Sequence, residues 1–118
     1  MKSEKEIVQE YRRMVINEFI DLIAVRQPEA CILLDKLLYA SSPASVITFK
    51  KFCGYYTGTR KQIEEIADED HRSKERINQI VAVVMGKLYY ITRYRQIAEF
   101  IEFVRRFDKN EKMSPNVP

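Results

Sequence analysis

Hydrophobic positions recur at helical spacing along most of this chain, and the clearest example is the stretch 62–88. Ile63 and Ile66 share one side of a short first segment, and apolar residues return at positions 77, 80, 84 and 88 of a longer second segment. Ser73 precedes the second segment, where its hydroxyl can cap a helix N-terminus. The pattern predicts two helices joined by a short polar turn. Such a pair is the skeleton of a helix-turn-helix, and it is also common in small helical bundles.

Three further helices are predicted upstream of this pair. Ser3 and Glu6 form a capping-box pattern at the start of a helix expected over residues 3–26. Its expected inner stripe consists of Val8, Tyr11, Val15, Phe19 and Leu22, widened by Ile7, Met14 and Ile23. A very apolar second helix should begin at Pro28, either buried in the monomer or forming half of a dimer interface. A third helix should end at Gly54.

The C-terminal part continues the helical period. T-x-x-Q at 59–62 is a second capping-box pattern and predicts a helix start there. Apolar residues then recur to about position 107, at Tyr94, Ile97, Ala98, Ile101 and Val104. The pattern does not decide whether the helix breaks between residues 86 and 92, because a glycine costs only about 1 kcal/mol in a helix interior. Residues 109–118 are expected to be a flexible tail.

A single domain fits the length and composition. With 118 residues, 46% of them hydrophobic, the chain can form one core over residues 1–108, with an N-terminal helical pair (3–40) and a helix-turn-helix part (41–102). Only three Gly and four Pro are present, so we predict an all-α fold of five or six helices. Cys31 and Cys53 are far apart without a CxxC motif, the N-terminus is charged, and no apolar run is long enough to span a bilayer. These features indicate a cytoplasmic protein without a membrane partner.

The net charge of +3 is small, but its distribution along the chain is uneven. Residues 1–58 hold eight Lys and Arg against seven Asp and Glu, and residues 59–71 hold two against five. Residues 72–118 hold ten against five. The chain therefore turns from acidic to basic at Arg72, where the second segment of the predicted helix-turn-helix begins.

Several short motifs share one ungapped register: IEEIADE at 63–69, SKERINQI at 73–80 and IAEFIE at 97–102, with Gly54 upstream. Together they make residues 41–102 resemble region 4 of primary bacterial sigma factors, the domain that recognises the −35 promoter element. The resemblance implies a helix-turn-helix that binds double-stranded DNA, with RNA polymerase as a further partner. It covers about half of the chain. The part of a sigma factor that opens the promoter has no counterpart in it, so a complete sigma factor is not expected.

The resemblance assigns DNA contacts to the helix that follows Ser73. Its base-reading positions fall on Lys74, Glu75, Asn78 and Gln79. Lysine can donate to guanine, glutamate can accept from cytosine, and asparagine or glutamine can pair with adenine. Arg72, Arg76 and the backbone at Ser73 are expected to hold phosphates. The alternative for each residue is a solvated helix face with charge pairs one turn apart.

Two departures from the sigma pattern favour a different function. The family's Leu-Gly-Val turn is replaced by Asp70, His71 and Arg72, which predicts a reshaped turn or helices that splay apart. Apolar residues also exceed what one core contact needs, and a partner or dimer surface is predicted at Val81, Val83, Met85, Phe100, Phe103 and Phe107. The phenylalanine row should meet either the first helix or a second chain.

Signals for an enzyme are weak. His71 is the only histidine, and its acidic neighbours in sequence point in different directions on a helix. The chain has no Gly-rich phosphate loop, nucleophile elbow or HExxH motif. We therefore expect no catalytic activity, cofactor or metal. The leading interpretation is a small stand-alone DNA-binding transcription regulator that forms a homo-oligomer. The alternative is an interaction protein whose degenerate helix-turn-helix binds RNA polymerase or another protein, or dimerises, without reading DNA.

Overall fold

The computed structural model describes the backbone of residues 1–113 and the side chains of residues 1–107. This part of the chain forms six helices and no strand, so the predicted all-α fold is confirmed. The helices are α1 (Glu4–Ala24), α2 (Pro28–Leu37), α3 (Pro43–Cys53), α4 (Ile63–Asp70), α5 (Lys74–Tyr89) and α6 (Ile91–Met113).

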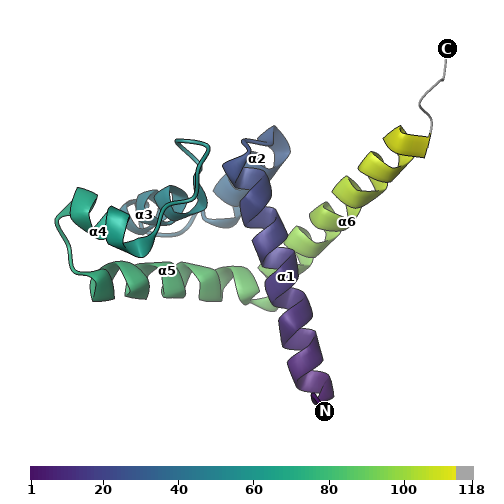
Figure 1. Ribbon diagram of the computed structural model, residues 1–118, viewed down its shortest axis with the longest axis horizontal. Coiled ribbons are helices and arrows are strands. Elements are labelled where there is room, and N and C mark those ends of the chain that lie inside the picture. Colours follow the sequence, from purple (N-terminus) through teal and green to yellow (C-terminus); the bar gives the residue numbers. More distant parts are fainter. Residues whose placement is uncertain (114–118) are drawn as a thin grey trace.

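Figure 1 shows how the helices are arranged around α1. The α3 and α4 helices lie over one side of α5, and α2 packs near the C-terminal end of α1. The α6 helix starts beside α1 at the end of α5 and then runs away from the body. The first turns of α1 and the last turns of α6 therefore project in different directions.

The helix ends follow the capping chemistry of the sequence in most places. The Ser3 hydroxyl accepts a hydrogen bond from the Glu6 amide at 3.2 Å, and Pro28 occupies the first turn of α2. Gly54 ends α3 with φ of +82°, and a Cβ added there would lie 2.6 Å from the Thr59 backbone. The predicted start of α4 at Thr59 is wrong. Its N-cap is Gln62, three residues later, because the Thr57 hydroxyl instead bonds to the Thr59 backbone and holds a turn there.

The helical conformation is interrupted at Tyr90, between α5 and α6. The sequence pattern alone leaves open whether the helix breaks between residues 86 and 92, and the structure shows that it does. Tyr90 has extended backbone angles, and its carbonyl accepts from the Tyr94 amide at 2.8 Å. Gly86 stays inside α5 with open space around it. The α6 helix continues to Met113, past the predicted start of the tail at residue 109, since neither Gly nor Pro interrupts it before Pro115. The rest of the predicted tail, residues 114–118, lies outside the described residues.

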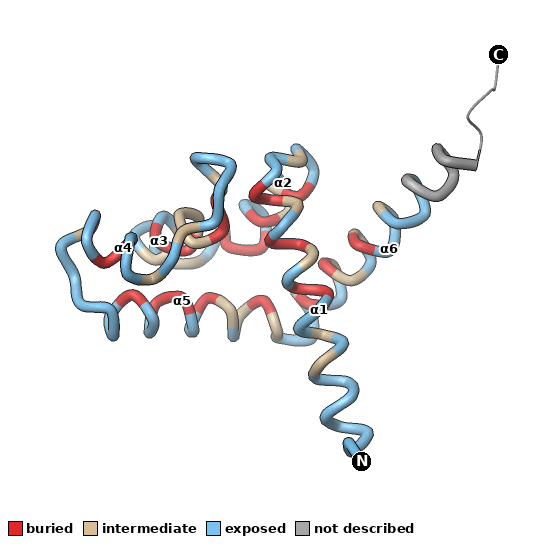
Figure 2. Tube along the Cα trace, viewed as in Figure 1, coloured by how far each residue is buried: buried red, intermediate tan, exposed pale blue. Residues whose placement is uncertain are grey.

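One core joins all six helices, with the second half of α1 at its centre (Figure 2). Phe19, Phe49, Ile66, Ile77 and Ile97 are among its fully buried side chains. The predicted inner stripe of the first helix is only half right. Its later members pack in or against the core, whereas four earlier members are exposed: Ile7, Val8, Tyr11 and Met14. They lie in the N-terminal turns of α1, the first of which project beyond the body, while Tyr11 lines a hollow with Tyr94 and Arg105 of α6.

Candidate nucleic-acid interface

The α5 helix is fixed by its ends and by one apolar face. The Ser73 hydroxyl accepts a hydrogen bond from the Arg76 amide at 3.1 Å, which caps the N-terminus as predicted. The side chains that anchor α5 to the core are Ile77, Ile80, Val81, Val84 and Leu88. Because these residues occupy one side of the helix, the opposite side faces solvent from Ser73 onward.

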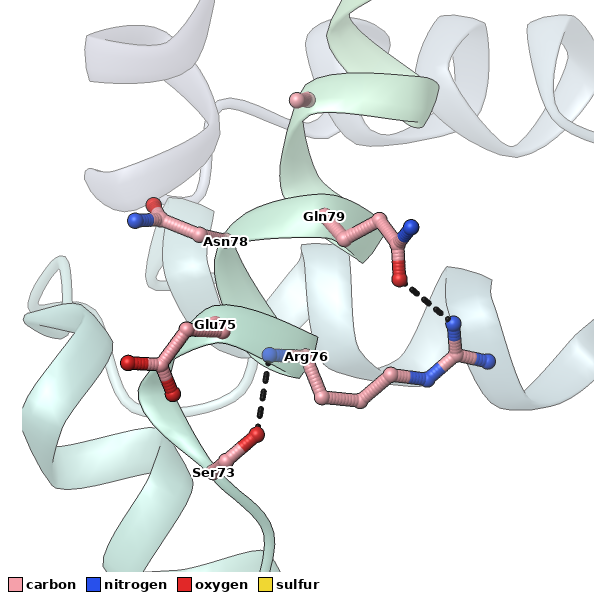
Figure 3. A pocket seen from close by; sticks show the side chains of 6 residues that line it. Ser73, Glu75, Arg76, Asn78 and Gln79 are labelled. Carbon is pink, nitrogen blue, oxygen red and sulfur yellow. Dashed lines mark hydrogen bonds between the residues drawn. The ribbon is translucent and has the colours of Figure 1, made fainter.

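All seven residues assigned to DNA contact are exposed: Arg72, Ser73, Lys74, Glu75, Arg76, Asn78 and Gln79. Five of them and Ala82 line a shallow, open hollow on α5 (Figure 3). Glu75 and Asn78 point to one side of this hollow, and Arg76 and Gln79 to the other. The Arg76 guanidinium donates to the Gln79 side-chain oxygen at 3.0 Å. The helix therefore presents donors and acceptors side by side without burying them.

Positive charge at the start of α5 is not paired with any carboxylate among residues 1–107. Among the salt bridges formed by residues 1–107, none involves Arg72, Lys74 or Arg76. Glu75 also takes part in none of them. These cations are available for an anionic partner.

The neighbouring α4 helix carries the opposite charge. Glu64, Glu65 and Asp68 are exposed on it. Glu69 is bound by Lys61, whose hydrogen bond and charge hold the pKa of this carboxyl below its usual value. An anionic partner is therefore attracted to the start of α5 and repelled by the outer face of α4.

The turn between α4 and α5 keeps a compact geometry despite its polar sequence. His71 has φ of +54° and ψ of +45°, the left-handed conformation that glycine adopts most easily. The Arg72 amide donates to the Ala67 carbonyl at 3.0 Å, and the His71 amide donates to the Asp68 carbonyl at 3.4 Å. These two bonds form a Schellman motif.

Asp70 points toward α3, where its carboxylate accepts from Lys51 at 2.6 Å. Of the two predicted alternatives, a reshaped turn or splayed helices, the structure does not have the second, because Ile66 and Ala67 of α4 pack in the same core as Ile77 of α5. An ion pair to α3 occupies the position at which the sigma pattern has an apolar residue.

The predicted partner surface is divided by the fold. Val81 is only 7% exposed, and Met85 packs against the core, so neither forms a free surface. Phe100 is also partly buried, with its ring edge-to-face on Phe19 at 6.1 Å between centroids. The exposed members of the predicted surface are Val83 on α5 and Phe103 and Phe107 on α6, at 56%, 64% and 58%. The phenylalanine row thus meets α1 at its first member and solvent at the other two.

The exposed apolar residues at the start of α1 were not predicted as a surface. Their period matches that of the buried half of the helix, so the sequence has no signal that separates the two halves. Arg12 lies among them, with its guanidinium 5.1 Å from the centre of the Tyr94 ring. This contact holds α1 against α6 at the point where the projecting turns of α1 begin.

No metal-binding group of three or more His, Cys, Asp and Glu side chains occurs in the described part of the chain. Cys31 and Cys53 are free thiols, and burial raises the pKa of Cys53 to about 12. In the same residues, no helix has the length and apolar content needed to cross a membrane.

Comparison with protein-family models, curated proteins and solved structures gives no match to this chain. The likeness to sigma region 4 therefore depends on the sequence motifs.

Proposed function

We propose that this protein is a small transcription regulator that binds double-stranded DNA through α5, in the manner of a sigma region 4 domain. The observation that supports the proposal best is the exposure of all seven assigned residues at the capped start of α5 and in the turn before it. The turn is compact, and its Arg72 together with Lys74 and Arg76 of α5 forms no salt bridge with the carboxylates of residues 1–107. An α-helix of this kind fits the major groove of B-form DNA.

In this proposal each part of the interface has its own role. Arg72, Arg76 and the backbone amides at Ser73 hold phosphates, which sets the register of the protein on the duplex. Lys74, Glu75, Asn78 and Gln79 meet base edges. The acidic face of α4 stays away from the phosphate backbone, so the duplex approaches α5 from the side opposite α4.

Mobility-shift titrations with 30-base-pair duplexes of random central sequence test the proposal at 50 mM salt. Binding should weaken with salt at a log–log slope of roughly −4 to −5, as expected for four to six phosphate contacts. Lys74→Ala should relax base preference, because one good base contact is worth about 1–3 kcal/mol of discrimination. Arg106→Ala is the matched control, since Arg106 pairs with Glu102 on α6. The absence of any shift at low salt with every duplex would contradict the proposal.

A second candidate is an interaction protein that binds RNA polymerase, another protein or a second copy of itself. Two exposed apolar sets favour it: the four residues at the start of α1, and Phe103 with Phe107, whose rings stack at 6.5 Å between centroids. Their burial would stabilise a complex by roughly 1.5–3 kcal/mol for each large side chain, less the cost of association.

Light scattering at micromolar concentration tests the self-association form of this candidate. The wild type should have a mass above that of the 14.0 kDa monomer, and Phe103→Glu with Phe107→Glu should return it to monomer size. Val25→Glu changes another exposed apolar side chain and should leave the mass unchanged. A wild-type mass near 14 kDa would rule out a homo-oligomer and leave these surfaces to a different protein.

A further inference from the structure

The exposed face of α5 continues beyond the residues assigned to base reading. Ala82 lines the same hollow as Asn78 and Gln79, one helical turn further along. Val83 lies seven residues after Arg76, which places the two side chains on the same line of the helix surface. Gly86 follows, and a Cβ added there would meet nothing within 4 Å. The face therefore changes from polar to apolar after Gln79.

Ala82 and Val83 do not belong to a larger apolar surface on α5. Their apolar neighbours Ile80, Val81 and Val84 turn inward and are buried. A pair of small exposed side chains is too little for a protein-docking patch, which normally spans several hundred Å². The pair is continuous instead with the polar hollow and the free cations at the helix start.

We propose that Ala82 and Val83 read the C5-methyl groups of thymine in the major groove, which extends the recognised site beyond the bases read by Asn78 and Gln79. This inference depends on the proposed DNA binding. The thymine methyl is the apolar group that the major groove presents to a protein, and alanine-sized side chains are suited to it. The cations at the start of α5 are complementary to the phosphates that flank such a site.

Helix geometry also gives the position of the thymine. One turn of α-helix advances about 5.4 Å, and base pairs in B-form DNA are about 3.4 Å apart. A helix lying along the groove therefore places Val83 one or two base pairs beyond the base read by Gln79. Residues 74–83 together cover about 15 Å, or roughly four base pairs.

Replacing thymine by uracil in the DNA tests this proposal, because the substitution removes the methyl group and leaves the base-pairing groups unchanged. A duplex enriched by the protein from the random pool is synthesised with deoxyuridine at each thymine position in turn. Binding is measured by fluorescence anisotropy. At one position, or two neighbouring ones, affinity should fall about fourfold, as expected when one methyl group is no longer buried.

Ala82→Ser combined with Val83→Ser should bind the thymine and uracil duplexes with affinities within about 1.5-fold of each other, because both apolar contacts proposed for the methyl group are then removed. Val25→Ser is the control, since this valine is exposed at the end of α1, and it should keep the fourfold difference. Circular dichroism should show both variants to be as helical as the wild type.

Two outcomes separate this inference from the proposed function. If the wild type binds the enriched duplex but no uracil substitution changes its affinity, methyl reading is overturned and DNA binding remains. If the double variant lowers affinity for both duplexes by the same factor, so that the fourfold difference between thymine and uracil persists, these side chains contact DNA without reading the methyl group, and the inference again fails. If no duplex is enriched or bound, the proposed function itself is wrong and the inference falls with it.

Discussion

Replacing His71 by glycine should stabilise the protein, because this residue has a left-handed backbone at the turn between α4 and α5. A residue with a Cβ pays roughly 1–2 kcal/mol in that conformation, and histidine is among the side chains that tolerate it best. Glycine removes this cost but adds roughly 0.5–1 kcal/mol of backbone entropy to the unfolded chain. The net gain should be about 0.5–1 kcal/mol, or about 2–4 °C in Tm for a domain of this size.

Urea and thermal denaturation followed by circular dichroism measure this change. Ala82→Gly is the matched control, because Ala82 is exposed in the interior of α5 and its replacement should cost about 1 kcal/mol. His71→Ala keeps the Cβ and should show no gain, which separates the backbone effect from loss of the imidazole. The reasoning is refuted if His71→Gly destabilises the protein as much as Ala82→Gly does.

Three further predictions concern the core, the turn and the thiols. Ile80→Asp should cost several kcal/mol and abolish cooperative melting because it buries an unpaired charge, whereas Val83→Asp on the exposed face should melt close to the wild type. Asp70→Asn should lower stability by about 0.5–1 kcal/mol in urea titrations. In the wild type, the hydrogen bond to the Asp70 carboxylate raises the pKa of Lys51 above its usual value of 10.5. The stability difference between wild type and variant should therefore hold from pH 7 to 9 and shrink only as the pH rises past 10.5. The buried thiol of Cys53, with a pKa of about 12, should react with iodoacetamide at pH 8 only after urea unfolds the protein.

Local chemistry explains which parts of the fold are predictable from the sequence. Ser3, Pro28, Gly54 and Ser73 mark helix ends through groups in their own neighbourhood, and the structure has helix ends at all four. The break at Tyr90 has no such local signal. Gly86 is the better breaker by intrinsic preference, but it remains in α5 because packing of the whole helix outweighs about 1 kcal/mol.

Periodicity shows which side of a helix is apolar, but it does not show whether another helix covers that side. This explains why Val15 is buried and Tyr11 is exposed in one stripe of α1. The same limitation applies to Phe100 and Phe103, since only the first lies close enough to Phe19 to pack.

The exposed face of α5, unlike the uncovered apolar positions of α1 and α6, was predictable from periodicity. Its polar residues alternate with a buried apolar set, so the side facing solvent follows from the pattern once the helix is placed. The geometry of the turn was not predictable in this way. Asp70 and His71 are poor matches to an apolar plug and a glycine, and only the partner Lys51 on α3 and the Schellman bonds explain how they fit.

The two candidate functions use separate surfaces, and this bears on whether they compete. The start of α5 lies at one end of the molecule, while the projecting turns of α1 and α6 leave the body around its other end (Figure 1). The projecting turns of α1 and α6 therefore form a surface separate from the start of α5. Binding of a partner at the projecting turns is then compatible with DNA binding by α5. A dimer formed through those turns would carry two copies of α5, and binding to two half-sites would compensate for one short recognition helix. Loss of DNA affinity in Phe103→Glu with Phe107→Glu, at a protein concentration where the wild type is dimeric, would reveal this coupling. Equal affinity in both would make the two surfaces independent.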